Sequence, residues 1–158
     1  MDYDEYLSRV KANFNSEKNV EINGWSTKMF YEEKFEIKWI ATKLKIFSFL
    51  TCIPHITAQD ISQYSSACVS HALNTYKGLP RGFQNGVGSF NVIASEKIDA
   101  QAITFATSRP KKHFAAFEMP IIYNLSNNEI IYYEKTPMWG AIYYKFFRET
   151  IEKNFNVH

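Results

Sequence analysis

Four basic or titratable side chains fall within five consecutive residues, Arg109-Pro110-Lys111-Lys112-His113. Guanidinium and ammonium groups bind phosphate oxygens through charge-assisted hydrogen bonds. The segment therefore predicts contact with an anion, a phosphate backbone or an acidic partner, with Lys111, Lys112 and His113 as candidate ligands. The alternative is a solvated loop whose charges favour solubility, which is the commoner role of so short a run.

A glycine-rich segment, residues 78–88, offers a second way to hold a phosphate, and it contains four of the chain's six glycines. Glycines let backbone amides approach a phosphate, and Arg81, Gln84 and Asn85 are the side chains that would contact it. The segment is not a P-loop, because it lacks the Gly-Lys-Ser/Thr ending and precedes a strand. Its glycine spacing also differs from a dinucleotide fingerprint. A helix C-cap at Gly78, followed by a structural connection, is the favoured alternative.

Aromatic side chains within residues 135–144 form a third candidate surface. Tryptophan and tyrosine rings can stack on a base or fill a pocket of a partner. Helical spacing instead predicts that most of these rings line the core. The predicted core stripe comprises Trp139, Ile142, Tyr143, Phe146 and Phe147. Tyr144 lies off this stripe, so we expect it to be the exposed aromatic residue.

Two cysteine–histidine pairs raise the question of a metal site or a nucleophile. Cys52 lies three residues before His55, and Cys68 lies three residues before His71. On a helical wheel Cys68 belongs to a buried stripe and His71 projects about 60–130° away from it, so the four side chains are not expected to converge. A nucleophilic pair formed by Cys52 and a histidine would need a third, orienting group. We therefore expect neither a metal nor a cofactor.

Charged residues alternate along the predicted strand 29–37 and end in Glu36-Ile37-Lys38, the acid-x-Lys form of one large nuclease fold. The expected order of helix, three strands, helix and strand loosely resembles that fold. In the nuclease fold the motif belongs on the third strand, where this chain has Lys43 and Lys45 but no carboxylate. The partner aspartate on the second strand is also missing, and such enzymes need clustered acids to hold Mg²⁺. A strand with alternating surface charges is the favoured interpretation.

Alternating helices and strands are expected to position these residues. Apolar periodicity predicts helices at residues 2–14, 57–77 and 95–107 and from residue 138 onward. Strands are predicted at residues 20–25, 29–37, 44–53, 90–94, 114–125 and 129–134, with turns at Asn23-Gly24 and Ser126–Asn128. Strands separated by helices favour parallel pairing, and the late hairpin adds antiparallel pairing. The predicted fold class is α+β, with a mixed β-sheet of about five to six strands and helices packed on its faces in one globular domain, residues 1–158.

The composition narrows the class of protein. A chain of 158 residues can bury a sizeable core, and the 16% aromatic share supplies large contact areas. The net charge of +2 argues against an extended nucleic-acid-binding surface but leaves a local patch open. Two cysteines do not make a disulfide framework, and no run approaches the ~18 apolar residues of a membrane span. The acidic opening lacks the apolar region of a secretory signal, so we expect a cytoplasmic protein that does not bind membranes.

Three sequence blocks resemble segments of a family of uncharacterised prokaryotic proteins. They are Gly78-Leu-Pro-Arg-Gly82, Pro110-Lys-Lys-His-Phe-Ala-Ala-Phe-Glu118 and Thr136-Pro-Met-Trp-Gly-Ala-Ile-Tyr-Tyr144, all in the second half of the chain. The resemblance points to a prokaryotic protein but implies no activity, so no residue role rests on it.

Two functions remain open on these observations. The first is a non-enzymatic binding or assembly module that uses segments 78–88, 109–113 and 143–144. Its partner would be a phosphate-bearing ligand, another protein or a second copy of the chain. Because these segments lie at helix–strand junctions, we expect two of them to share an edge of the sheet. The alternative is an enzyme or degenerate nuclease-like domain acting on a phosphorylated or nucleic-acid substrate, which would require Glu118 or Glu134 near the basic segment.

Overall fold

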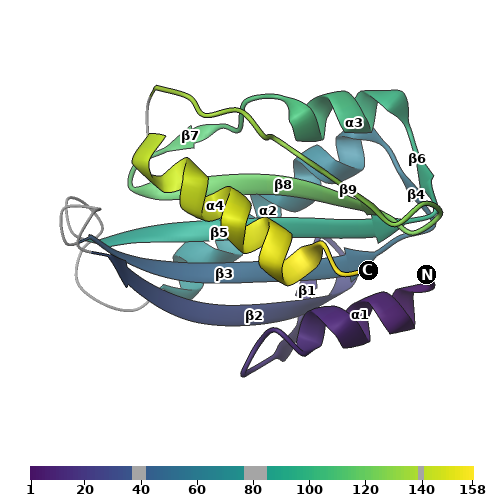
Figure 1. The fold of residues 1–158 in the computed structure, drawn as a ribbon, viewed down its shortest axis with the longest axis horizontal. Helices are drawn as coiled ribbons and strands as arrows, with labels where there is room; N and C mark the ends of the chain where they lie inside the picture. The colour runs from purple at the N-terminus through teal and green to yellow at the C-terminus, as the bar shows by residue number, and fades with distance from the viewer. Residues whose placement is uncertain (37–41, 77–84, 139–140) are drawn as a thin grey trace.

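Three layers make up the computed structural model, which describes residues 1–36, 42–76, 85–138 and 141–158. A mixed β-sheet forms the middle layer (Figure 1). In the described residues, α1 (Tyr3–Lys11) and α4 (Ala141–Phe155) cover one face of the sheet, and α2 (Ala58–Thr75) and α3 (Ala100–Thr107) cover the other. The predicted α+β class is confirmed.

An antiparallel meander forms the first half of the sheet. It consists of β1 (Lys18–Ile22), β2 (Trp25–Glu36) and β3 (Thr42–Cys52). The predicted Asn23-Gly24 turn joins β1 to β2, and both turn residues have positive φ. Asparagine and glycine tolerate this conformation better than other residues, which explains the tight connection.

Parallel pairing forms the second half of the sheet. β5 (Asn85–Ser95) pairs parallel with β3, and β8 (Ala116–Asn124) pairs parallel with β5. β7 (Lys112–His113) and β9 (Glu129–Tyr132) pair antiparallel with opposite ends of β8. The described residues thus form seven strands in this sheet, slightly more than predicted, because the short β7 was not expected.

The helix ends follow local capping in one case and tertiary contacts in another. α2 begins as predicted with a capping box, in which Thr57 and Asp60 each bond the other's backbone amide. The predicted start of α3 at Ser95 is wrong. Ser95 instead ends β5, and β6 (Lys97–Ile98) pairs with β4 (His55–Ile56) before the helix begins. Among the helices of the described residues, none has both the length and the apolar character needed to cross a membrane.

Part of the glycine-rich segment belongs to β5. A Cβ atom on Gly86 would lie 2.8 Å from the Leu44 side chain, closer than packed atoms approach. Gly88 also lies within the strand, opposite Ile46 of β3. These two glycines therefore serve sheet packing rather than a phosphate loop, whereas Gly78 and Gly82 lie outside the described residues.

The buried side of α4 differs from the predicted stripe. Its core positions include Tyr144, Phe147, Ile151 and Phe155, whereas Ile142 is 44% exposed. Both stripes have helical spacing, so periodicity in the first turns cannot choose between them. The observed stripe runs to the last turn of the helix and therefore buries more apolar surface against the sheet.

Candidate anion-binding site

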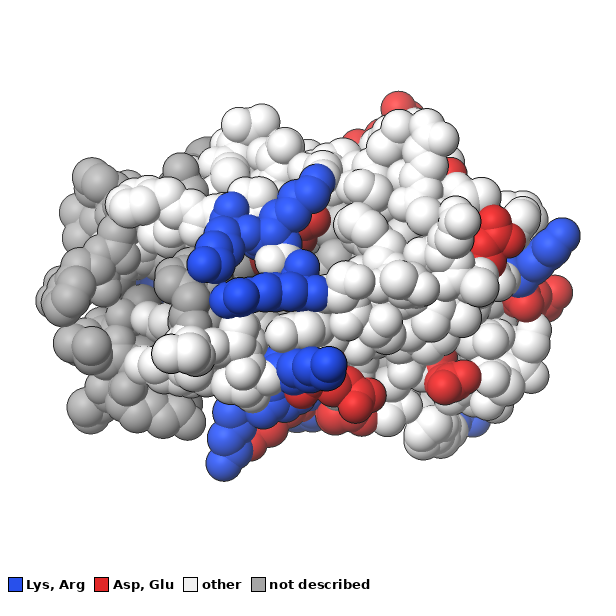
Figure 2. Space-filling model, turned by 90° about the horizontal axis from the view of Figure 1, so that it is seen from above, with Lys and Arg blue, Asp and Glu red and all other residues white. Residues whose placement is uncertain are grey.

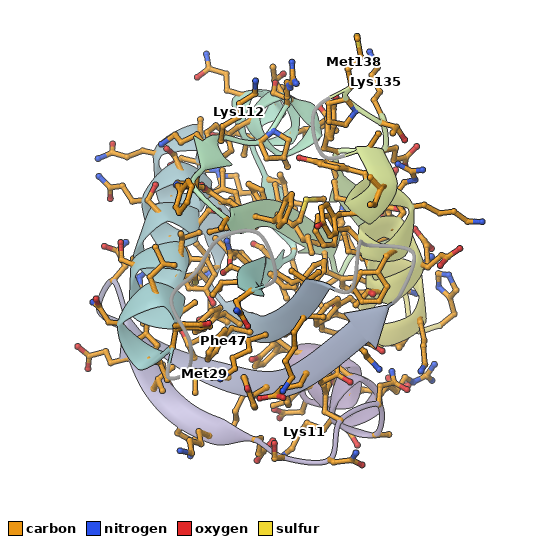
Figure 3. All side chains as sticks on the ribbon, turned by 90° about the vertical axis from the view of Figure 1, so that its left-hand side faces the viewer. Lys11, Met29, Phe47, Lys112, Lys135 and Met138 are labelled. Carbon is orange, nitrogen blue, oxygen red and sulfur yellow. The ribbon has the colours of Figure 1, made fainter. Side chains whose placement is uncertain are left out.

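Candidate segments from three parts of the chain meet at one end of the sheet. Asn85 opens β5, and β7 pairs with the first residues of the parallel strand β8. β9 runs antiparallel to β8, so the chain after Tyr132 returns to the same end. We call this the amino-terminal end of the sheet, and Figure 3 looks onto it, with Lys112, Lys135 and Met138 on its upper side. Asn85 and the basic segment thus share this end in the described residues, while Arg81, Gln84 and Trp139, on which the predicted co-location also depends, lie outside them.

The basic segment, residues 109–113, lies on the surface of this end. Arg109, Lys111 and Lys112 are exposed, whereas Pro110 is buried and anchors the chain. Figure 2 shows lysine and arginine side chains gathered on the upper face of the molecule. The Lys111 ammonium lies 3.4 Å from the hydroxyl of Ser66, so the segment also contacts α2. These positive charges form a local patch, although the net charge of the whole chain is small.

His113 connects the basic segment to a buried carboxylate. Its Nε2 lies 2.7 Å from Oε2 of Glu118, whose side chain is 1% exposed, against 29% for the imidazole. A carboxylate only accepts hydrogen bonds, so Nε2 is the donor. Within the described residues, Nδ1 of the ring makes no further hydrogen bond. His113 is thus held by one nitrogen, and its imidazole remains 29% exposed.

A chain of buried hydrogen bonds holds Glu118 beneath α2. Ser65 of α2 donates to Oε1 of Glu118 at 2.7 Å, and Asn91 of β5 donates to the Ser65 hydroxyl at 2.9 Å. Ser89 donates in turn to the side-chain carbonyl of Asn91 at 2.5 Å. We call Ser65, Ser89, Asn91, His113 and Glu118 the polar network. It fixes both oxygens of Glu118 and, through them, the position of His113.

Sequence reasoning included His113 and considered Glu118, but it missed Ser65, Ser89 and Asn91. The available signal was Glu118 itself, a charged residue within β8, whose other core positions are apolar. Ser89 and Asn91 alternate on β5 with apolar neighbours, so they share one face of the strand. Their meeting with Ser65 depends on how α2 crosses the sheet, which no local pattern reveals.

Tyr144 is not the exposed aromatic that its position off the predicted stripe suggested. It is 3% exposed and packs edge-on against Tyr133 and Phe147, with ring centroids 6.1 and 5.5 Å away. Burial raises the pKa of its phenol above the ordinary value. The ring belongs to the core because α4 turns this side to the sheet, so Tyr144 does not contribute a stacking surface.

Each histidine of the two cysteine–histidine pairs has another neighbour. His55 bonds Asp99 at 2.7 Å, and the ring of His71 lies edge-on to Phe49 at 5.8 Å. Burial raises the pKa of the Cys68 thiol well above its ordinary value, which disfavours the thiolate that a metal or a nucleophilic reaction requires. Within the described residues, no group of three histidine, cysteine or carboxylate side chains is arranged to hold a metal ion.

The acid-x-Lys segment continues beyond the described residues, since Ile37 and Lys38 lie outside them. In the described part of β2, Glu33 pairs with Lys43 at 2.8 Å and with Lys45 at 3.8 Å across the β2–β3 ladder. These contacts match the favoured interpretation of alternating surface charges.

Comparison with known proteins finds no matching protein-family model, no similar curated protein and no similar solved structure.

Proposed function

We propose that the protein is a non-enzymatic binding module that recognises a phosphate-bearing ligand at the amino-terminal end of its sheet. Arg109, Lys111 and Lys112 would supply the positive charge, and His113 would supply a directed hydrogen bond from Nδ1 in its protonated form. The observation that carries the proposal is the anchoring of His113 on the buried Glu118 at 2.7 Å.

A purely structural loop would not need this arrangement. Burying a carboxylate costs several kcal/mol of desolvation, about as much as its hydrogen bonds return, and apolar side chains of similar volume would serve a core equally well. The polar network instead holds a partly exposed imidazole at the end of the basic segment, residues 109–113. A side chain held in place before binding loses less entropy when a ligand arrives, so the network favours recognition.

An enzyme acting on a phosphorylated substrate is the second candidate, and one observation favours it. Such an enzyme needs a carboxylate beside the basic segment, and Glu118 lies there, whereas Glu134 is exposed to solvent. An imidazole oriented by a carboxylate is the usual form of a general acid or base. Release of inorganic phosphate from a phosphomonoester, abolished by His113→Gln, would establish this candidate in place of the module.

We also place the module in a prokaryotic cytoplasm. Cys52 and Cys68 are both free thiols, and Cys52 is exposed, which suits a reducing compartment. A homo-oligomer formed through the same end of the sheet is compatible with this role, and light scattering with and without ligand would test it.

Calorimetric titration with inorganic pyrophosphate tests the module directly. The double variant Lys111→Ala/Lys112→Ala should bind at least about tenfold more weakly than wild type, because two charge-assisted contacts are removed. Lys145→Ala/Lys153→Ala is the matched control, since it removes the same charge from exposed positions on α4. Equal affinity of the two double variants, or no binding by wild type, would refute the proposal.

A further inference from the structure

A cavity lies on the opposite flank of α2 from His113. It has a volume of about 370 Å³ and is lined by Lys18, Met29, Tyr31, Lys45, Phe47 and Thr75, among others. The lining comes from β1, β2, β3 and the last turn of α2, and Figure 3 shows Met29 and Phe47 between the helix and the lower strands. This volume lies within the range of small-molecule sites.

Apolar and aromatic groups form one wall of this cavity. Met29 and Phe47 are buried beneath it, and Tyr31 is 38% exposed although its ring lies only 5.1 Å from that of Phe47. The Tyr31 hydroxyl donates to Glu33 at 2.7 Å, which holds the ring in place. A fixed and partly exposed ring above an apolar floor suits a flat aromatic group.

Positive charge dominates the rim of the cavity. Glu17 pairs with Lys11 at 2.8 Å, and Lys28 lies 3.9 Å from the same carboxylate. On the other side Glu33 is shared between Lys43 and Lys45 at 2.8 and 3.8 Å. In the described part of the chain Lys18 has no ion-pair partner. Among the charged residues that line the cavity, Lys18 and Lys45 are positive and Glu17 is negative, and Glu17 is already paired with Lys11, so the surplus charge of the lining is positive.

We propose that this cavity binds a small planar aromatic anion. The aromatic body would lie against Tyr31 above Phe47 and Met29, and its carboxylate or phosphate group would pair with Lys18. Lys45 also lines the cavity and adds a second positive charge there, and its ammonium lies 4.9 Å from the centroid of the Tyr76 ring. The proposed phosphate site relies on the charges of the basic segment and on His113, whereas this cavity adds an apolar wall. The two sites would therefore select anions by different features.

Calorimetry with 2-naphthoate and 1-naphthyl phosphate tests this second site and separates carboxylate from phosphate recognition. At least one of them should bind wild type, and the uncharged naphthalene-2-carboxamide should bind at least about tenfold more weakly. Lys18→Ala and Tyr31→Ala should each weaken the aromatic anion by about tenfold, whereas Lys34→Ala, on the other face of β2, should not. Lys18 and Tyr31 lie at the surface, and thermal unfolding would verify that the variants fold.

Several outcomes would overturn the inference. In the first, neither aromatic anion binds. In the second, wild type, Lys18→Ala and Tyr31→Ala bind the aromatic anion equally. In the third, pyrophosphate displaces the aromatic anion fully. The double variant Lys111→Ala/Lys112→Ala separates the two proposals, because it should lose pyrophosphate but retain the aromatic anion. Loss of both ligands in that variant would also contradict a separate cavity site.

Discussion

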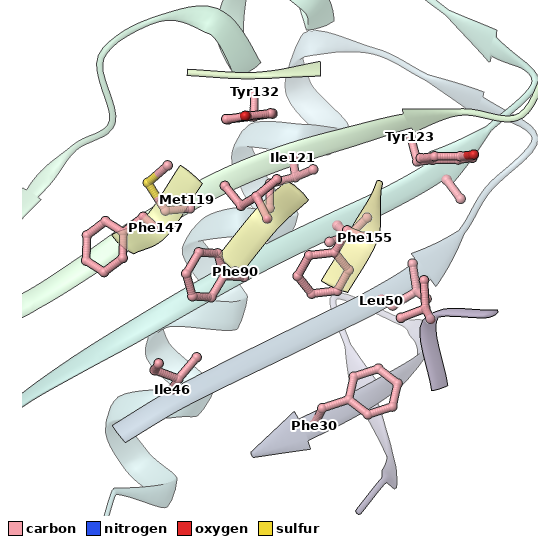
Figure 4. Close-up of a cluster of buried hydrophobic side chains, with 14 of the residues drawn as sticks. Phe30, Ile46, Leu50, Phe90, Met119, Ile121, Tyr123, Tyr132, Phe147 and Phe155 are labelled. Atoms are coloured by element: carbon pink, nitrogen blue, oxygen red, sulfur yellow. The ribbon is translucent and has the colours of Figure 1, made fainter. Parts of the chain in front are cut away.

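The two faces of the sheet bury very different side chains. The α4 face is mainly apolar and aromatic, although it also buries Ser48 of β3 and Thr150 and Asn154 of α4. Figure 4 shows its apolar cluster, which includes Phe30, Ile46, Phe90, Met119, Phe147 and Phe155. The α2 face has its own apolar core but also buries Ser65, Ser89, Asn91 and Glu118. Apolar side chains of similar volume could fill the polar positions, as they fill most of the α4 face, and Glu118 is the one carboxylate among the described buried residues. The polar groups on the α2 face therefore point to a role other than stability.

Truncating an aromatic ring on the α4 face should have the largest effect. Phe90 is fully buried and packs edge-on against Phe147 at 5.8 Å. Phe90→Ala should lower the free energy of unfolding by about 3–5 kcal/mol, because it removes buried apolar surface and leaves a cavity. Urea denaturation would measure this, with Phe90→Leu as the milder control. A loss below about 1 kcal/mol would show that this face is not the stabilising one.

Changes in the polar network should separate stability from binding. Glu118→Ala should cost about 1–3 kcal/mol, because it leaves Ser65 without its acceptor and His113 without its anchor. The combined variant Ser65→Ala/Ser89→Ala/Asn91→Leu/Glu118→Met should restore stability to within about 1 kcal/mol of wild type, since apolar groups replace the buried polar ones together. Pyrophosphate binding should be weak in both variants.

Urea denaturation and calorimetry on the same preparations would measure both properties. A combined variant at least as unstable as Glu118→Ala would mean that the network exists for stability. A combined variant that binds pyrophosphate as wild type does would mean that the network does not position His113.

The smallest effect should come from the surface pairs beside the cavity. Hydrogen bonds from Lys43 and then from Tyr31 lower the pKa of Glu33 below its ordinary 4.5. A carboxyl whose pKa is lowered on folding contributes stability above the unfolded value and loses it as the pH falls through the folded value. The contribution should stay below about 1 kcal/mol, because solvent screens this exposed pair.

Urea denaturation between pH 6 and pH 3 would test this, with Glu33→Gln as the comparison, because the amide keeps the shape without titrating. Wild type should exceed the variant in stability at pH 6, and the gap should close in acid below the ordinary pKa of a glutamate. A gap that widens as the pH falls would contradict the ion pairing observed at this position.

Local signals in the sequence predicted much of the fold. The Thr57 capping box, the Asn23-Gly24 turn and the order of the major strands depend on neighbours within a few residues, so a local pattern is enough to identify them. Ser95 has the chemistry of a helix cap, but its backbone extends the ladder between β5 and β8 instead. A partner distant in sequence thus overrides the local preference there.

The candidate site was less accessible to sequence reasoning. His113 and Glu118 are five residues apart. Antiparallel pairing of β7 with the first residues of β8 brings the two side chains together. Ser65 and Asn91 come from α2 and β5, and their meeting depends on the crossing of a helix over a sheet. Tyr144 was misplaced for a related reason, because the later turns of α4 decide which side of the helix is buried.

The central claim is that Glu118 holds one nitrogen of His113 and leaves the other for an anion. ¹⁵N NMR of the histidine ring, recorded during a pyrophosphate titration, observes both nitrogens separately. We expect the Nδ1 resonance to shift on binding while Nε2 keeps the signature of its hydrogen bond to Glu118, with both responses lost in Glu118→Gln. An unchanged Nδ1 resonance at saturating pyrophosphate would contradict the account.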